Sequence, residues 1–277
     1  MTTTTCSVED FEFVRRLVRE RSAIALEPGK EYLVESRLAP LARREGLSSV
    51  ADLVCVLRSG GTTRLMTAVV EAMTTNETSF FRDVHPFEAL RSELIPRILR
   101  ANGGDRLAMW SAAAATGQEA YSLALLVREH FRHLSRITIL GTDLSEGVLD
   151  RARSGRFTQL EVNRGLPASL LVRYFEQDGV EWRIDETVRR MVTFRQANLA
   201  QPLTGIPPMD VIFLRNVLIY FDAVTKRKVL AEVARVLRPG GFLFLGGPET
   251  TYGIDPAYER FEVGRTVCYR LRVAGAA

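Results

Sequence analysis

The spacing of hydrophobic positions changes once along the chain. In the first part, apolar residues recur at helical spacing, as at Phe11, Val14 and Leu17 after Ser7, which has the character of a helix N-cap. Beyond about residue 105, short continuous apolar runs alternate with helical segments instead. The pattern therefore predicts a helical N-terminal region followed by an α/β region.

The N-terminal region is predicted to contain four helical segments. The first follows Ser7, and the others are expected at residues 30–45, 49–57 and 63–73. Pro40 lies inside the second segment, and because proline removes a helical hydrogen bond we expect it to kink or split that helix.

The α/β region is predicted to form a mostly parallel, doubly wound sheet, because strands and helices alternate along the chain. Strands are expected at residues 107–111, 137–141, 192–196, 211–215 and 242–246. Helices are expected at residues 87–100, 118–132, 145–153 and 223–237. The alternating tail at residues 261–271 predicts one antiparallel edge strand.

Residues 155–191 interrupt this alternation. Within them, Asp178-Gly179 lies between two short strand-like runs and is a strong hairpin signal. We therefore predict three domain-level parts: a helical domain at 1–75, a linker and connecting helix at 76–100, and an α/β domain at 101–277 that carries a small β-rich insertion at 155–191.

Composition narrows the class of protein. An apolar fraction of 46% and a charged fraction of 25% are typical of a soluble globular protein, and no apolar run reaches the ~18 residues of a membrane span. The first residues lack the features of a secretory signal. The three cysteines are scattered, which argues against a disulfide framework or a metal site and suits a cytoplasmic location. A net charge of +4 is too mild to indicate nucleic-acid binding.

The stretch from Leu107 to Ser122 reads as a buried strand, a turn of small residues and a helix. Such a turn lets backbone amides approach a ligand, and the following helix N-terminus favours a negative group. Only Gly117 matches the glycine fingerprint of dinucleotide-binding turns, so an ordinary strand-to-helix turn remains the alternative.

Polar residues follow several of the predicted strands, where ligands bind in open α/β sheets. Asp143 ends the second strand at a position suited to a ribose hydroxyl, with a helix N-cap as the alternative. Arg215, Asn216 and Tyr220 follow the fourth strand, and Asn198 follows the third.

Five stretches together resemble the CheR-type chemotaxis-receptor methyltransferases. They are Thr74-Thr-Asn-Glu-Thr-Ser-Phe-Phe-Arg82, Trp110-Ser-Ala-Ala-Ala-Ala-Thr-Gly-Gln-Glu-Ala-Tyr-Ser122, Thr142-Asp143, Asn198-Leu199 and Arg215-Asn-Val-Leu-Ile-Tyr-Phe-Asp222. They occur in the family's order and at about its spacings. The resemblance implies a class I, Rossmann-like methyltransferase domain that uses S-adenosylmethionine and releases S-adenosylhomocysteine.

The resemblance also implies roles for individual residues. Positions where the family contacts the cofactor are occupied by Asn76, Thr78, Arg82, Glu119, Asp143, Asn198, Leu199, Arg215 and Asn216. Arg82 would pair with the methionine carboxylate, and Tyr220 would lie beside the sulfonium, so these two are the expected catalytic residues. The sequence departs from the family at Gln118, at Ala120 and at Gly247-Pro248-Glu249.

The implied reaction is methylation of glutamate side chains on the cytoplasmic helical domain of methyl-accepting chemoreceptors, by a monomeric cytoplasmic enzyme without a metal. Methylation of another substrate, or cofactor binding without catalysis, are the alternatives. Arg37, Arg43 and Arg44 form a candidate receptor-docking stripe on the second helix, whose alternative is a solvated face. The short acidic hairpin predicts that no receptor-tail peptide is needed.

Overall fold

The computed structural model describes residues 7–272 and contains two compact units. The helical unit comprises the described residues up to Thr75 together with the segment Tyr220–Thr225. The α/β unit comprises Asn76–Ile219 and the described residues from Lys226 onward.

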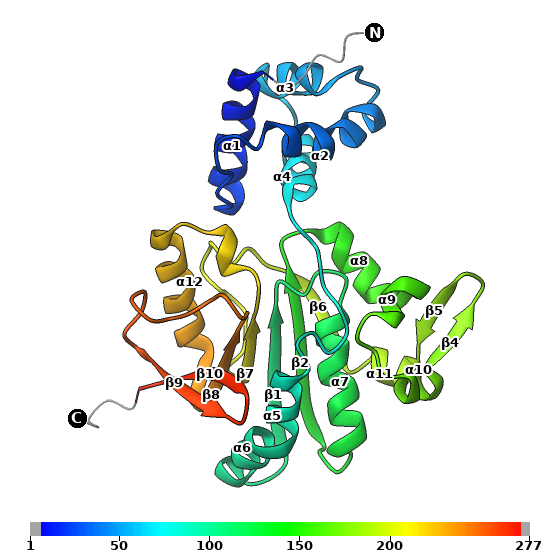
Figure 1. Ribbon diagram of the computed structural model, residues 1–277, viewed down its shortest axis with the longest axis vertical. Helices are drawn as coiled ribbons and strands as arrows, with labels where there is room; N and C mark the ends of the chain where they lie inside the picture. Colours follow the sequence, from blue (N-terminus) through cyan, green and yellow to red (C-terminus); the bar gives the residue numbers. More distant parts are fainter. Residues whose placement is uncertain (1–6, 273–277) are drawn as a thin grey trace. The chain divides into compact units, whose positions relative to one another are not determined.

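Four helices make up most of the helical unit: α1 (Val8–Ser22), α2 (Glu31–Arg44), α3 (Val50–Arg58) and α4 (Thr63–Met73) (Figure 1). The side chains of Ser7, Ser49 and Thr62 accept hydrogen bonds from backbone N–H groups in the first turns of α1, α3 and α4. Each helix buries one apolar face in a shared core, which confirms the predicted all-helical region.

Pro40 does not split the second helix. α2 is a single helix from Glu31 to Arg44 with Pro40 inside it, so of the two predicted outcomes, a kink or a split, the split does not occur. Val34, Leu38 and Leu41 are buried on either side of the proline, and this packing offsets the lost hydrogen bond.

The segment Tyr220–Thr225 packs within the helical unit. The carbonyl oxygen of Tyr220 accepts a hydrogen bond of 2.9 Å from the N–H of Ala25, and Ile24 forms an isolated β-bridge with Phe221. Arg19 and Asp222 form an ion pair of 2.8 Å. Residues distant in sequence are therefore joined in this unit.

The α/β unit is built on a seven-stranded sheet with the order β6-β2-β1-β7-β8-β10-β9 (Figure 1). Its strands are β1 (Arg106–Ala112), β2 (Arg136–Asp143), β6 (Val192–Gln196), β7 (Met209–Leu214), β8 (Leu237–Leu245), β9 (Tyr258–Val263) and β10 (Thr266–Leu271). The pairings among β6, β2, β1, β7 and β8 are parallel, as predicted.

The tail forms two strands where one was predicted. β9 and β10 pair antiparallel across a turn at Gly264-Arg265, and β10 pairs with β8. Gly264 adopts a φ of +56°, a left-handed conformation that allows this tight reversal. The sequence prediction missed the turn because its only strong signal is one glycine.

Helices connect and cover the strands: α5 (His85–Ala89), a π-helical turn at Leu90–Leu94, α6 (Ile95–Asn102), α7 (Gln118–His130), α8 (Glu146–Ser154), a 3₁₀ turn at Leu218–Tyr220 and α12 (Ala223–Val236). α7 is the most deeply buried of them, since every residue from Gln118 to Val127 is buried. It packs against β1 and β2, and its first turn is thereby fixed beside the ends of those strands.

The predicted insertion is a small antiparallel sheet of order β3-β5-β4, with β3 (Arg156–Thr158), β4 (Phe175–Asp178) and β5 (Glu181–Ile184). Three short helices accompany it: α9 (Gln159–Asn163), α10 (Ala168–Tyr174) and α11 (Glu186–Arg189). Phe157 and Phe175 contact Phe80 edge-to-face, with ring centroids 4.9 and 5.7 Å away. These contacts anchor the insertion to the core of the α/β unit.

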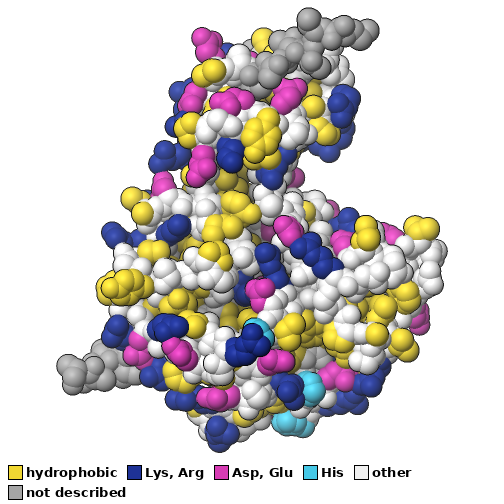
Figure 2. Space-filling view, in the orientation of Figure 1, with side chains coloured by type: hydrophobic (Ala, Val, Ile, Leu, Met, Phe, Trp, Pro, Cys, Tyr) yellow, Lys and Arg dark blue, Asp and Glu magenta, His cyan; other side chains and the backbone are white. Residues whose placement is uncertain are grey.

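Within residues 7–272, no helix combines the length and apolarity that crossing a membrane requires. On the face of the molecule drawn in Figure 2, basic and acidic side chains are interspersed.

Candidate active site

The turn between β1 and α7 has an unusual backbone. Ala113, Ala115 and Gly117 adopt φ values of +61°, +48° and +95°, so every second residue is left-handed. Such conformations are strained for alanine and occur mainly at functional sites. At Gly117, an added Cβ would lie 3.0 Å from the Cβ of Ala152 and 3.1 Å from the ring of Phe194. The chain therefore forms a tight turn like those of dinucleotide-binding folds, with only one of the glycines that such turns usually contain.

Asp143 holds this turn from the end of β2. Its carboxylate accepts hydrogen bonds from the N–H of Ala115 (2.9 Å) and the N–H of Ser145 (3.1 Å), and the residue is 7% exposed. The N-cap of α8 is Ser145, whose hydroxyl accepts from Val148 N–H. Asp143 is therefore not the cap of this helix, and its carboxylate lies next to the β1–α7 turn.

Glu119, Arg215 and Asp83 form a charge network in which Glu119 and Arg215 are buried and Asp83 is exposed. The carboxylate of Glu119, in the first turn of α7, accepts from Arg215 Nη1 (3.0 Å) and from the Ser111 hydroxyl (2.8 Å). Arg215, directly after β7, also pairs with Asp83. The sequence analysis missed Asp83 and Ser111, although Asp83 directly follows Arg82 and Ser111 lies near the end of the first strand.

Burial raises the pKa of the Glu119 carboxyl above its usual range, while the Arg215 charge and the Ser111 hydrogen bond oppose this rise. Perturbed carboxyls of this kind are frequent at functional sites. The structure therefore brings two of the predicted residues, Glu119 and Arg215, into direct contact beside the turn.

Asn216 lies next to Arg215 and has a left-handed backbone, which asparagine adopts more readily than most residues. It has a φ of +57°, its Oδ1 is buried without a hydrogen-bond partner, and its N–H donates to Glu249 (2.7 Å). Glu249 also accepts hydrogen bonds from the N–H groups of Gly246 (2.6 Å) and Ile219 (3.2 Å). These bonds fix the segments that follow β7 and β8. The sequence analysis noted Glu249 only as part of a departure from the family.

Other predicted residues lie nearby in the same unit. Asn198 and Leu199 follow β6, the strand paired with β2, and Leu199 is 8% exposed. Arg82 is half-buried, and its Nη1 donates to the carbonyl oxygen of Glu77 (3.3 Å). The Arg82 charge also opposes the raised pKa of Glu119. Asn76 and Thr78 precede Arg82 in the same loop.

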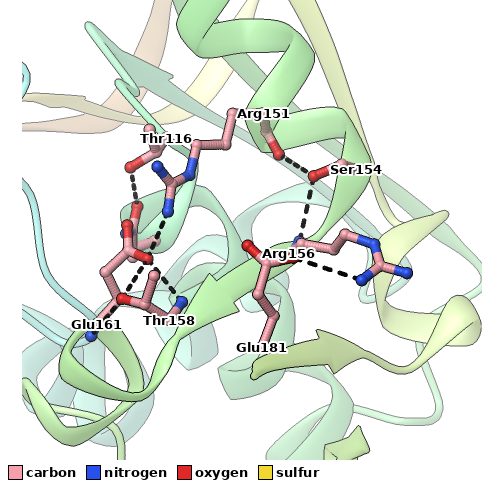
Figure 3. Close-up of polar contacts among 8 residues, drawn as sticks. Thr116, Arg151, Ser154, Arg156, Thr158, Glu161 and Glu181 are labelled. Carbon is pink, nitrogen blue, oxygen red and sulfur yellow. Dashed lines mark hydrogen bonds and ion pairs between the residues drawn. The ribbon is translucent and has the colours of Figure 1, made fainter. Parts of the chain in front are cut away.

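Gln118 connects the turn to the insertion, whose residues Thr158 and Glu161 are drawn in Figure 3. Its amide oxygen accepts from the Thr116 hydroxyl (2.8 Å), and its amide nitrogen lies 3.4 Å from the carboxylate of Glu161. Glu161 closes a capping box with Thr158 and pairs with Arg151 at 2.7 Å. The side chain that faces Glu161 is therefore a neutral amide and not a second carboxylate.

Comparison with known families shows to which family this chain belongs. The profile described as "CheR methyltransferase, SAM binding domain" matches residues 76–266, and "CheR methyltransferase, all-alpha domain" matches residues 9–74. The chain belongs to the CheR methyltransferase family. The resemblance noted from its motifs is thereby confirmed.

Similar proteins extend over nearly the whole chain. Chemotaxis protein methyltransferase 1 of Pseudomonas aeruginosa is 39% identical over 271 residues, which cover 95% of this chain and 98% of that protein. Chemotaxis protein methyltransferase Cher2 of Pseudomonas putida is 38% identical and covers 95% and 98%. Chemotaxis protein methyltransferase of Vibrio anguillarum is 37% identical and covers 98% and 100%.

This CheR protein is an S-adenosylmethionine-dependent methyltransferase. Its α/β unit offers groups that suit the cofactor. Carboxylate oxygens at Asp143 can accept from ribose hydroxyls, and the buried, unpartnered Oδ1 of Asn216 can accept a further hydrogen bond. Tyr220 belongs to the other unit, and its role remains a prediction.

The three docking candidates of the helical unit differ from one another. The Arg37 guanidinium donates to the carbonyl oxygens of Met73 (2.6 Å) and Thr74 (3.2 Å) and to the Thr75 hydroxyl (2.7 Å). Arg37 therefore ties α2 to the end of α4. Arg43 and Arg44 are exposed, and in the described part of the chain neither has a hydrogen-bond or ion-pair partner.

Proposed function

We propose that this CheR protein transfers a methyl group from S-adenosylmethionine to glutamate side chains of chemoreceptor signalling domains, forming glutamate methyl esters in the cytoplasm. The observation that carries the proposal is the buried Glu119–Arg215 pair beside the strained β1–α7 turn, in a chain that matches both CheR profiles. The names of its chemotaxis methyltransferase relatives support a chemoreceptor as the acceptor.

The acceptor chemistry needs no general base. A glutamate side chain has an unperturbed pKa of about 4.3, so it is already a carboxylate at neutral pH. When bound, the cofactor supplies an electrophilic methyl group on a sulfonium. The protein has to hold the carboxylate oxygen in line with this methyl group and exclude water.

We assign the binding and alignment roles as follows. Asp143 accepts from the ribose, with Asn198 and Leu199 nearby, while Arg82 pairs with the methionine carboxylate. Asn76, Thr78, Glu119, Arg215 and Asn216 complete the cofactor-binding set. Tyr220 stabilises the sulfonium through its ring or oxygen, with about 0.5–2 kcal/mol from cation–π attraction. Arg82 and Tyr220 are thus the residues proposed to act in catalysis.

We further propose that the helical domain at 1–75 recognises the receptor, as a monomer, through Arg43 and Arg44. Two exposed positive charges suit the acidic, glutamate-bearing face of a receptor helix. Arg37 supports them by positioning α2, because its guanidinium is occupied by α4 and the residues after it.

We also propose that methylation does not depend on a peptide at the receptor's C-terminus. The hairpin of β4 and β5 has strands of four residues joined by Gly179-Val180. Glu176 and Asp178 on the outer strand β4 are exposed and would disfavour an acidic tail, although Arg183 and Arg156 offset part of their charge. A strand this short offers few backbone groups for β-augmentation.

The reaction is tested by incubating the full chain with methyl-labelled cofactor and purified receptor signalling domains. Label that is released by mild base, and that is lost when the receptor glutamates are replaced by alanine, is the expected result. Base-stable label would point to a different acceptor group. Cofactor binding without any label on receptors would instead identify a non-catalytic binding protein.

A further inference from the structure

A pocket of about 380 Å³ opens in the α/β unit beside the charge network. Its wall runs from Arg215, after β7, and Gly246, after β8, to Arg260 on β9 and Arg265 in the β9–β10 turn. Asp83 and Glu249 also line it. Of these residues, only Arg215 was predicted from the sequence to bind a ligand.

The acidic groups of this pocket are already used. Asp83 pairs with Arg215, and Glu249 accepts three backbone N–H groups, from Gly246, Asn216 and Ile219. Neither carboxylate therefore requires a positively charged ligand group as a partner.

The basic groups, in contrast, retain unused donors. Arg215 has a side chain only 2% exposed, yet its Nε–H has no acceptor. Arg265 is exposed and has no hydrogen-bond or ion-pair partner among residues 7–272. The pocket is also lined by His85, whose buried Nδ1 has no hydrogen bond and is not counted among these donors. Arg260 pairs with Glu262 on the surface. A buried donor without an acceptor is costly, so this wall favours an anionic ligand.

We propose that this pocket binds a carboxylate of the acceptor protein that neighbours the glutamate being methylated. The proposal rests on the proposed function. Arginine is suited to carboxylates because its planar fork donates two parallel hydrogen bonds. The pocket is therefore a specificity site, which selects acceptor glutamates that have a second acidic side chain close by.

The position of the pocket favours the acceptor over the cofactor as the source of this carboxylate. Asp143 lies at the end of β2, whereas Arg265 adjoins β10, which is separated from β2 by β1, β7 and β8. At a spacing of about 4.8 Å between strands, that is roughly 19 Å. Arg215 lies between the two places, so the pocket extends away from the ribose side of the sheet.

The first test compares Arg265→Glu with Arg106→Glu, a matched reversal at the opposite, amino end of β1. For Arg265→Glu we expect KM for a receptor signalling domain to rise about tenfold with kcat nearly unchanged, because the reversed charge repels the carboxylate. The affinity for S-adenosylhomocysteine should stay the same in both variants. Arg265→Gln is the milder variant if the reversal prevents folding.

The second test changes the acceptor. Replacing the acidic neighbours of the methylated glutamate by the corresponding amides should raise KM for the wild-type enzyme but not for Arg265→Glu, since the interaction is then already lost. Additive effects, or an unchanged KM in Arg265→Glu, would overturn the proposal.

Two further outcomes separate other sources of the anion. Weaker S-adenosylhomocysteine binding in Arg265→Glu would assign the pocket to the cofactor. Inhibition by inorganic phosphate that is competitive with cofactor and abolished in Arg265→Glu would assign it to a free anion. Both contradict the acceptor-carboxylate proposal. Failure of the wild-type enzyme to methylate any receptor domain would instead refute the proposed function.

Discussion

Arg215 and Glu119 are 96 residues apart in the sequence and form an ion pair of 3.0 Å in the interior of the α/β unit. Their side chains are 2% and 11% exposed. The pair links the residue after β7 to the first turn of α7. It therefore joins the end of β7 to the helix that follows β1. Because burial raises the pKa of Glu119, the pair depends on the Arg215 charge to keep the carboxylate ionised.

We therefore expect Arg215→Met to destabilise the cofactor-free protein by about 3 kcal/mol at pH 7.5, the cost of leaving one member of a buried pair alone. The loss should shrink toward pH 5. Without Arg215 the folded-state pKa of Glu119 rises further, so protonation at lower pH removes the unpaired charge, and the penalty grows as pH rises through that pKa. Urea unfolding at both pH values measures this. Arg106→Met serves as control, and a pH-independent loss would contradict the role given to Glu119.

A second prediction separates the proposed cofactor role of Asp143 from helix capping. Asp143→Asn should weaken S-adenosylhomocysteine binding by about 1–3 kcal/mol, because a charged acceptor is lost. Ser145→Ala should lower stability by about 0.5–2 kcal/mol, since Ser145 is the N-cap of α8, and should leave affinity unchanged. Calorimetric titration and thermal unfolding of both variants check this. Equal affinity of Asp143→Asn and wild type would remove Asp143 from the cofactor site.

Local patterns in the sequence predicted most of the fold. The central strands β1 and β7 are mostly apolar runs, and Asp178-Gly179 specified the hairpin, so these features were visible locally. The failures involve long-range packing. Pro40 is tolerated because its neighbours are buried against other helices, and the β9–β10 turn depends on pairing with β8.

The same distinction applies to the candidate site. Asp143 and Arg215 were predicted as site residues from their places at strand ends and from the family motifs, and Glu119 from the family motifs alone. Their partners were not, because Asp83 lies 132 residues from Arg215 along the chain, and Ser111 reaches Glu119 only through the turn that joins β1 to α7. Similarly, spacing placed Arg37 with Arg44, whereas folding directs the Arg37 guanidinium to residues 36–38 positions further along the chain.

A third prediction concerns Gln118, which lies 3.4 Å from Glu161 and is 1% exposed. Gln118→Glu should destabilise the protein by about 1–3 kcal/mol at pH 7.5, because a second carboxylate would be buried beside Glu161. The new carboxyl would have a raised pKa, so the loss should diminish at pH 5. Gln118→Met removes the same hydrogen bonds without adding charge, and its loss should not change with pH. Thermal unfolding at the two pH values compares the variants, and identical profiles would refute the charge argument.

A fourth prediction concerns receptor docking. The double variant Arg43→Glu with Arg44→Glu should raise KM for a receptor domain about tenfold and leave the melting temperature unchanged, because both side chains are exposed and unpaired in the described structure. Arg37→Ala should instead lower the melting temperature, since three hydrogen bonds to the end of α4 and the residues after it are lost. An unchanged KM in the double variant would exclude this surface from receptor recognition.

The last prediction concerns the insertion and the receptor tail. Arg156 pairs with Asp178 and Glu181, so part of the acidic charge of the hairpin is neutralised by the neighbouring strand β3. Glu176 and Gln177 on the outer strand β4 remain exposed, and only four residues are available there to pair with an added peptide. We expect receptors with and without their last residues to be methylated at equal rates, and free tail peptides to show no binding by calorimetry.

Glu176→Lys is the matched variant for this prediction. If repulsion of acidic tails prevents binding, this change should allow weak tail binding. If the strand is too short, neither the variant nor the wild-type protein should bind a peptide. Micromolar binding of a tail peptide to the wild-type protein, or loss of methylation when the receptor tail is removed, would show that this hairpin is a tether.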